Sequence, residues 1–189
     1  MTAYLAPILE GLRAPRRSTE RVLSTDPGLE ATLGLVLVAY LVQALVSVAL
    51  ANPRGAGEVG IVPWHISGLF THALLFLLLS GLVFGVGRLF GGTGTLDRSI
   101  TAVAWYSYVT SWLSPLGVVA FLGLGEEGNA WELLSLVLLI GVAGIGVVVF
   151  AGAVAAVHGF RSVRMVLATT LGLALGASVL ISLVVSPPG

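Results

Sequence analysis

Residues 132–157 read ELLSLVLLIGVAGIGVVVFAGAVAAV, and after the first glutamate this stretch contains no charged side chain. A helix of that length would measure about 39 Å at roughly 1.5 Å per residue, enough to cross the hydrocarbon layer of a bilayer. Backbone groups inside that layer cannot bond to water, so a crossing segment must be helical. Four more runs of this kind cover residues 31–51, 66–87, 99–123 and 165–185. The sequence therefore predicts an all-α, polytopic transmembrane bundle of five helices.

The composition agrees with a membrane protein. Hydrophobic residues make up 57% of the chain and charged residues 10%, whereas about 25% of the residues of soluble domains are charged. Nine arginines balance nine acidic residues, so no net charge indicates a nucleic-acid partner, and the predicted partner is the lipid bilayer. Cysteine is absent, which excludes disulfides and thiolate metal sites. Abundant alanine and glycine without any lysine indicate a GC-rich bacterial genome.

The positions of the arginines predict the orientation. Eight of them precede the first run or lie in the second and fourth connections, and only Arg54 lies in the first connection. Arginine-rich connections stay in the cytoplasm, so we expect the N-terminus inside and the C-terminus outside the bacterial cytoplasmic (inner) membrane. The expected organisation is a cytoplasmic N-terminal segment (1–27), a five-helix transmembrane domain (28–185) and a short tail (186–189).

The N-terminal segment contains a short amphipathic stretch. Leu5, Ile8, Leu9 and Leu12 follow the i, i+3, i+4, i+7 spacing of one helix face. Two interpretations are open. The helix could lie on the cytoplasmic leaflet, with the following arginines attracted to anionic lipid, or it could pack against the cytoplasmic end of the bundle itself.

Two motifs connect the chain to a known family. Residues 90–96, FGGTGTL, form a glycine-rich turn without the Lys-Ser/Thr pair of a phosphate-binding loop, and we interpret it as a tight turn. With residues 98–105, RSITAVAW, and the His-Gly pair in residues 157–164, VHGFRSVR, this turn resembles the signature of the Yip family of Ypt/Rab-interacting-protein-like membrane domains. The order and spacing of the motifs extend the resemblance over most of residues 8–185.

The resemblance implies a compact five-helix integral membrane domain that has no known active site and works through contacts with other membrane components. The Rab-binding role of eukaryotic members does not transfer to a bacterium. Two positions depart from the family pattern. The proline of the third run is Pro115 rather than a residue just after the aromatic, and Ala155 and Ala156 stand where members often carry an acid.

The interiors of the runs contain no Asp, Glu, Lys or Arg, which argues against an ion-coupled carrier. His72 is the candidate intramembrane polar residue, either as a protonatable gate or as a neutral imidazole bonded to a neighbouring helix. His65 and His72 are seven residues apart, about 10 Å along a helix, so they cannot share one metal, and His158 lies at the other end of the bundle. We predict no catalytic residue, no metal site and no cofactor.

Basic residues should gather on the cytoplasmic face, where they could contact anionic lipid or a partner. Alternatively, the arginines serve only to set the orientation. The candidate contact residues are Arg13, Arg16, Arg17, Arg98, His158, Arg161 and Arg164.

Small residues predict where helices approach closely. The candidate helix-packing residues are Gly81 and Gly85 in the second run and Gly172 and Gly176 in the fifth. Pro115 should kink the third helix and free a carbonyl that Ser111 or Ser114 could satisfy. A glycine pair left facing lipid would serve a homo-oligomer or a larger complex.

Two classes of function follow. The first is a non-enzymatic integral membrane protein that acts as a scaffold, accessory subunit or organiser of membrane proteins or lipid. The second is a small carrier or channel for a neutral or lipidic solute, with His72 in its path. A wet crevice that reaches His72 would favour transport, and a closed bundle with an apolar outer groove would favour the scaffold.

Overall fold

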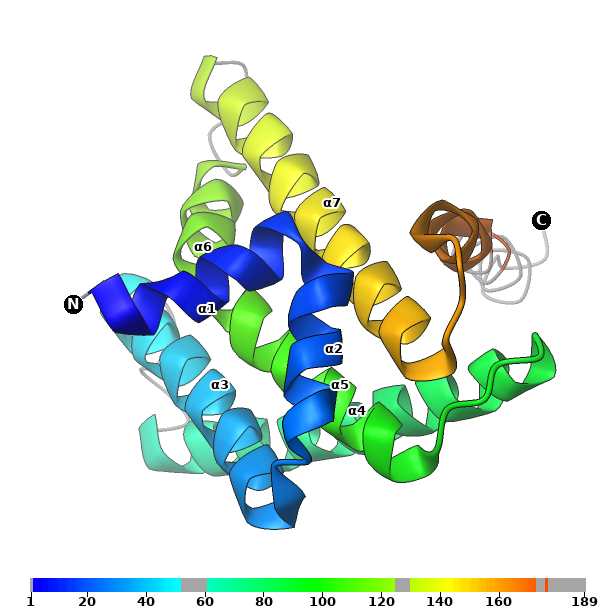
Figure 1. Ribbon diagram of the computed structural model, residues 1–189. Helices are drawn as coiled ribbons and strands as arrows, with labels where there is room; N and C mark the ends of the chain where they lie inside the picture. The colour runs from blue at the N-terminus through cyan, green and yellow to red at the C-terminus, as the bar shows by residue number, and fades with distance from the viewer. Residues whose placement is uncertain (1, 52–60, 125–129, 173–175, 177–189) are drawn as a thin grey trace, which may run out of the picture.

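The computed structural model describes residues 2–51, 61–124, 130–172 and 176. These residues form helices and contain no strand, which confirms the predicted all-helical fold class. In chain order the helices are α1 (Thr2–Arg13), α2 (Pro15–Thr25), α3 (Gly28–Ala51), α4 (Ile61–Leu89), α5 (Leu96–Ser111), α6 (Ser114–Gly123) and α7 (Ala130–His158), followed by a shorter helix, Val163–Gly172 (Figure 1).

Three helices within the described residues are long and apolar enough to cross a membrane. They are α3, α4 and α7, and they correspond to the first, second and fourth predicted spans. Large apolar side chains on their outer faces are exposed; Leu45 of α3 is 69% and Phe70 of α4 is 73% exposed. Such broad apolar surfaces are stable in contact with lipid rather than water. The protein is a helical membrane bundle.

The third predicted span is two helices rather than one, because the chain breaks between Ser111 and Ser114. Pro115 has no N–H to donate to the carbonyl of Ser111, four residues earlier, and its ring crowds that carbonyl. The hydroxyl of Ser114 donates to this oxygen instead, at 2.5 Å. The predicted kink and its compensation by Ser114 are confirmed, and the single helix over residues 99–123 is corrected to α5 and α6.

The fifth predicted span is described only at its beginning. The helix Val163–Gly172 agrees with the first part of the run at 165–185. The rest of this run, except Gly176, lies outside the described residues. So do the connection with Arg54 and the tail at 186–189.

α5 is one of two central helices. It contacts α1, α2, α3, α4 and α7, and α7 in turn contacts α1, α2, α4, α5 and α6. The inner faces of α5 carry small side chains, such as Ser99, Ala102 and Ala104, each 0% exposed. Small side chains let neighbouring helices approach closely in a membrane interior. Around them, Phe76 of α4 and Ala155 of α7 belong to the main hydrophobic cluster.

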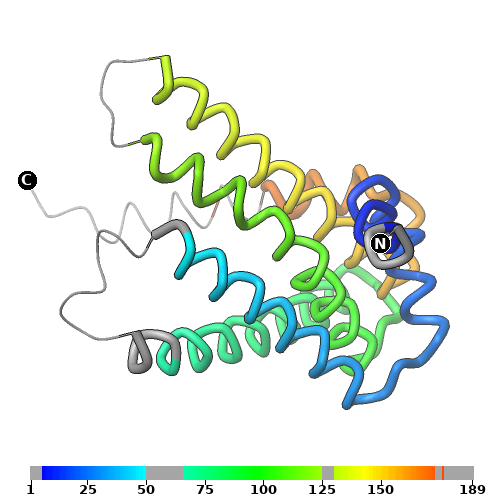
Figure 2. Tube along the Cα trace, turned by 90° about the vertical axis from the view of Figure 1, so that its left-hand side faces the viewer, coloured from blue at the N-terminus to red at the C-terminus, as the bar shows by residue number. Residues whose placement is uncertain are grey.

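α1 and α2 lie at the end of the bundle where α3 begins and α7 ends (Figure 2). Ile8 is 5% exposed, and Leu12 packs against the buried cluster of Trp105 and Val109, while Leu9 is 47% exposed. The side chain of Leu5 lies outside the described residues. Ile8 and Leu12 therefore face the protein, as expected for an N-terminal helix packed against the bundle.

Candidate functional site at the arginine-bearing end

His158 is the last residue of α7, next to the turn between α4 and α5, and it is only 2% exposed. Its Nε2 is 2.9 Å from the carbonyl oxygen of Val83, and its Nδ1 is 3.3 Å from the backbone nitrogen of Gly94. The carbonyl can only accept and the N–H can only donate. These contacts therefore assign the neutral imidazole with its proton on Nε2.

Glycines surround this imidazole. A Cβ atom added at Gly87, Gly92 or Gly94 would overlap with atoms of the His158 ring. Only glycine lets backbone segments approach a ring so closely. We call this set the His158 junction (Val83, Gly87, Gly92, Gly94 and His158); it joins α4, the α4–α5 turn and the end of α7.

The turns on either side of the ring are fixed by the backbone. Gly91 and Gly159 have φ angles of 79° and 69°, which side chains with a Cβ rarely adopt. The Thr93 N–H donates to the His158 carbonyl oxygen at 3.3 Å, and the Phe160 ring stacks on the imidazole at 5.6 Å. The glycine run is thus a tight turn that holds a histidine, and the two sequence motifs meet in space.

The N-terminal helices are anchored to the same end. The indole Nε1 of Trp105 donates to the hydroxyl of Ser18 at 3.1 Å, and both side chains are buried. A Cβ at Gly152 of α7 would lie 2.8 Å from Pro15 and 2.9 Å from the backbone nitrogen of Arg16. α2 therefore crosses α7 at a glycine, in direct contact with its backbone.

Arginine side chains form further contacts within and between these helices. The Arg16 guanidinium donates to Glu20 at 2.7 Å and to the backbone oxygen of Arg161 at 3.2 Å, which links α2 to the segment after α7. Arg21 donates to Glu10 at 2.6 Å and so holds α1 against α2. Exposed pairs like these contribute little stability individually, but they fix the orientation of the arginine side chains.

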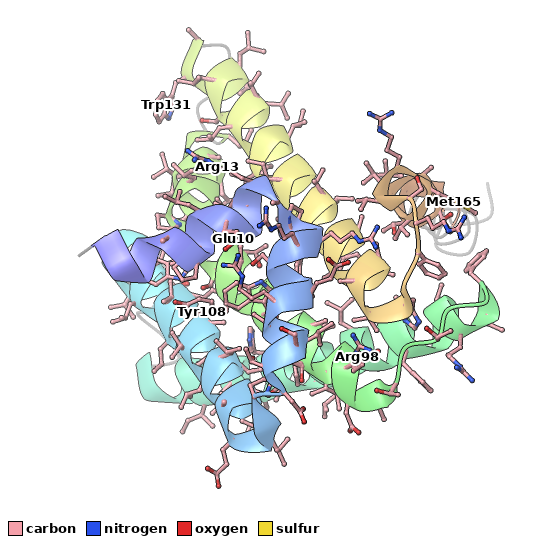
Figure 3. All side chains as sticks on the ribbon, in the orientation of Figure 1. Glu10, Arg13, Arg98, Tyr108, Trp131 and Met165 are labelled. Atoms are coloured by element: carbon pink, nitrogen blue, oxygen red, sulfur yellow. The ribbon has the colours of Figure 1, made fainter. Side chains whose placement is uncertain are left out.

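The remaining arginines of this end are exposed, and none forms a salt bridge with another described residue. Figure 3 shows Arg13 and Arg98 on different sides of α2. An unpaired guanidinium can bind phosphate or carboxylate oxygens through two parallel hydrogen bonds. The unpaired arginines are Arg13, Arg17, Arg88, Arg98, Arg161 and Arg164.

One candidate contact residue has a different place from the rest. His158 was expected on the surface beside the arginines, but its ring is enclosed by the glycines and by Phe160. The imidazole lies beneath the surface, where it holds the backbone of α4 and of the α4–α5 turn, and it is not exposed itself.

The predicted packing glycines and His72 take no part in the His158 junction. A Cβ at Gly81, Gly85, Gly172 or Gly176 would meet no described atom within 4 Å. His72 lies beside Tyr40, with ring centroids 5.6 Å apart, and its Nε2 is buried without a hydrogen-bond partner among the described residues. These glycines therefore do not contact the His158 ring, although Gly85 lies on α4 between Val83 and Gly87.

The described residues contain no group of three or more His, Asp or Glu that could hold a metal ion. The geometry defines a class of protein: an integral membrane bundle with an arginine-bearing end built around one buried histidine. A Yip1 domain profile matches residues 10–185, and the chain belongs to the Yip1 domain family. No curated protein and no solved structure matches the chain. The family match confirms the resemblance found in the glycine turn and the His-Gly pair.

Proposed function

We propose that the protein is a non-enzymatic scaffold, accessory subunit or organiser in the bacterial cytoplasmic membrane. The observation that carries the proposal is the construction of the arginine-bearing end. Three chain segments converge on His158, α2 is hydrogen-bonded to α5 and to the segment after α7, and α1 is ion-paired with α2. The product is a fixed surface with unpaired guanidinium groups. A fixed basic surface at a membrane boundary suits binding of anionic partners.

The orientation supports the same function. With the arginine-rich connections inside, α1, α2 and the α4–α5 turn lie at the cytoplasmic boundary, where anionic headgroups and acidic protein segments are available. Residues 1–27 then form a cytoplasmic segment docked on the transmembrane domain at 28–185. The arginines of this surface come from α1, α2, α4, α5, the segment after α7 and the helix Val163–Gly172.

The transport alternative lacks such support. It needs a crevice that reaches His72. A cavity lies between α4, α5, α6, α7 and the helix Val163–Gly172, and His72 is not part of its lining. That lining is mostly apolar. An apolar groove away from His72 fits a bundle that binds membrane components rather than one that conducts a solute.

The test is purification in mild detergent, followed by identification of copurifying proteins and lipids, for the native chain and for Arg161→Glu/Arg164→Glu. The native chain should retain a stoichiometric protein or an enrichment of anionic phospholipid, and the double variant should lose it. Arg161→Lys/Arg164→Lys is the matched control, because it keeps the charge. A native chain that copurifies with neither a protein nor anionic lipid would overturn the proposal.

A further inference from the structure

A cavity of about 420 Å³ lies between the helices at the break of the third span. Its apolar wall comes from α4 and α7, with Leu79, Val142, Val147 and Phe150. The volume falls at the lower end of the range of small-molecule sites, about 300 to 1,000 Å³. It fits a single slender chain with a small ring, and it is too small for a whole phospholipid.

The break in the third span explains the cavity. α6 packs on α7 through Gly123 against Ser135, and α5 packs on α7 through Val109 and Val149. Between these two contact zones the helix axis is interrupted before Pro115. The facing part of α7 carries Ala143 and Gly146, whose side chains are too small to close the gap.

Polar atoms also line this apolar space. The hydroxyls of Thr110, Ser114 and Thr170 line it, and each donates its proton to a backbone oxygen three or four residues earlier in the chain. Their oxygens can therefore accept a hydrogen bond but have no proton left to give.

Tyr106 supplies the donor. Its ring is held edge-on by Phe150 at 5.5 Å, and its hydroxyl oxygen would be 3.9 Å from a Cβ at Gly146. No described residue forms a hydrogen bond with this hydroxyl. A phenol in an apolar setting costs free energy unless it finds an acceptor, so the cavity favours a ligand that carries one.

The depth of Tyr106 limits what that ligand can be. Along α5 it lies eight residues beyond Arg98, or about 12 Å, within a hydrocarbon layer about 30 Å thick. Phospholipid carbonyls stay at the edge of that layer, and a charged headgroup is costly inside it. The acceptor must belong to a neutral lipid that can bring an uncharged oxygen this deep.

Access to the cavity is from the bilayer. Residues next to its lining point outward and are apolar; Leu78 is 60% exposed, Ile145 42% and Leu171 45%. In a membrane these faces contact acyl chains, so an occupant can enter sideways without crossing water.

From this arrangement we infer that the cavity binds a neutral, chain-bearing lipid with a carbonyl oxygen of the quinone type, which accepts a hydrogen bond from the Tyr106 hydroxyl. The chain lies along Leu79, Val142 and Val147. This site is separate from the arginine-bearing end, and the inference does not depend on the proposed scaffold role.

The test uses the full chain in phosphatidylcholine nanodiscs, titrated with decylbenzoquinone and followed by quenching of tryptophan fluorescence. The native chain should show saturable quenching. Tyr106→Phe should weaken the apparent affinity about 2- to 10-fold, as expected for one lost neutral hydrogen bond. Tyr108→Phe, which alters a tyrosine outside the lining, should match the native chain. Gly146→Leu should abolish saturation, and Ala143→Leu serves as a second blocking variant in case the first does not fold.

Two results would overturn the inference. Non-saturable quenching that is equal in the native chain and both blocking variants would mean simple partition into the bilayer. Equal affinity for Tyr106→Phe, with full competition by decylbenzene, would mean a slot for any hydrocarbon chain and no role for the carbonyl. Arg161→Glu/Arg164→Glu should leave the titration unchanged, which separates this site from the proposed function.

Discussion

His158 shows how one residue can organise the end of a membrane bundle. Its two ring nitrogens bond to α4 and to the α4–α5 turn, while its own carbonyl accepts from that turn. A buried imidazole with both nitrogens paired is fully satisfied and rigid. Replacing it leaves the Gly94 N–H unpaired in addition to a cavity, two separate sources of instability.

The first prediction concerns Gly87→Ala. The added methyl group would overlap the His158 ring, so the variant should lose about 1–3 kcal/mol of stability, as overpacking does. Gly81→Ala in the same helix is the matched control, since nothing described lies within 4 Å of its Cβ. It should be neutral or stabilise by up to about 1 kcal/mol through helix propensity. Thermal unfolding in detergent measures both.

The second prediction tests whether His158 is the cause. In a His158→Ala background the ring is gone, so the additional cost of Gly87→Ala should largely disappear. The double-mutant cycle should then show a coupling of about 1–3 kcal/mol between the two positions. Additive losses would mean that Gly87 is needed for another reason, and the junction as described would be incorrect.

At the scale of elements, local chemistry was readable from the sequence and long-range contact was not. Pro115 predicts a break because its effect falls on the carbonyl four residues earlier, and the structure has the break there. A glycine such as Gly87 permits another group to approach closely but does not identify that group. Its partner His158 lies in another helix, and the related contacts span 64 and 75 residues. Sequence periodicity relates residues of one helix and cannot identify a partner so far away in the chain. His158 was therefore expected at the surface.

The N-terminal helices illustrate the same limit. The apolar spacing of α1 predicts a helix with one apolar face, but bilayer and protein present the same apolar environment to that face. Ser18, which accepts from Trp105, could not be identified as a docking residue because a lone serine has no distinctive pattern. The burial of Ile8 and the contact of Leu12 with the bundle show that this face of α1 packs against the protein.

The third prediction concerns the break in the third span. Ser114→Ala should destabilise by about 1 kcal/mol, because the Ser111 carbonyl loses its donor. In a Pro115→Ala background the new N–H can serve that carbonyl, so Ser114→Ala should then be nearly neutral. Ser107→Ala is the control on the same span. An equal loss in both backgrounds would show that Ser114 acts through something other than the missing proline donor.

The fourth prediction concerns the docking of α2, and the absence of cysteine makes it easy to measure. Thr19 is 1% exposed and Arg17 is exposed, so Thr19→Cys should resist a maleimide reagent while Arg17→Cys reacts. Gly152→Leu should push α2 off α7, where a Cβ already meets Pro15 and Arg16. In that background Thr19→Cys should react at a rate near that of Arg17→Cys. Continued protection would mean that α2 is held without the Gly152 contact.

At the scale of the whole molecule, assembly depends on which surfaces the monomer leaves unused. Described atoms leave open space beside Gly172 and Gly176, and equally beside Gly34 on α3. A pair of glycines four residues apart permits a close helix approach, with weak Cα–H···O contacts between backbones, whereas lipid gains nothing from it. Gly172→Leu/Gly176→Leu should therefore leave the monomer folded and remove a homo-oligomer or copurifying partner. Gly34→Leu should change neither. Size-exclusion chromatography with light scattering in mild detergent distinguishes the outcomes: a collapsed monomer would place these glycines inside the bundle, and an unchanged assembly would show that they face lipid.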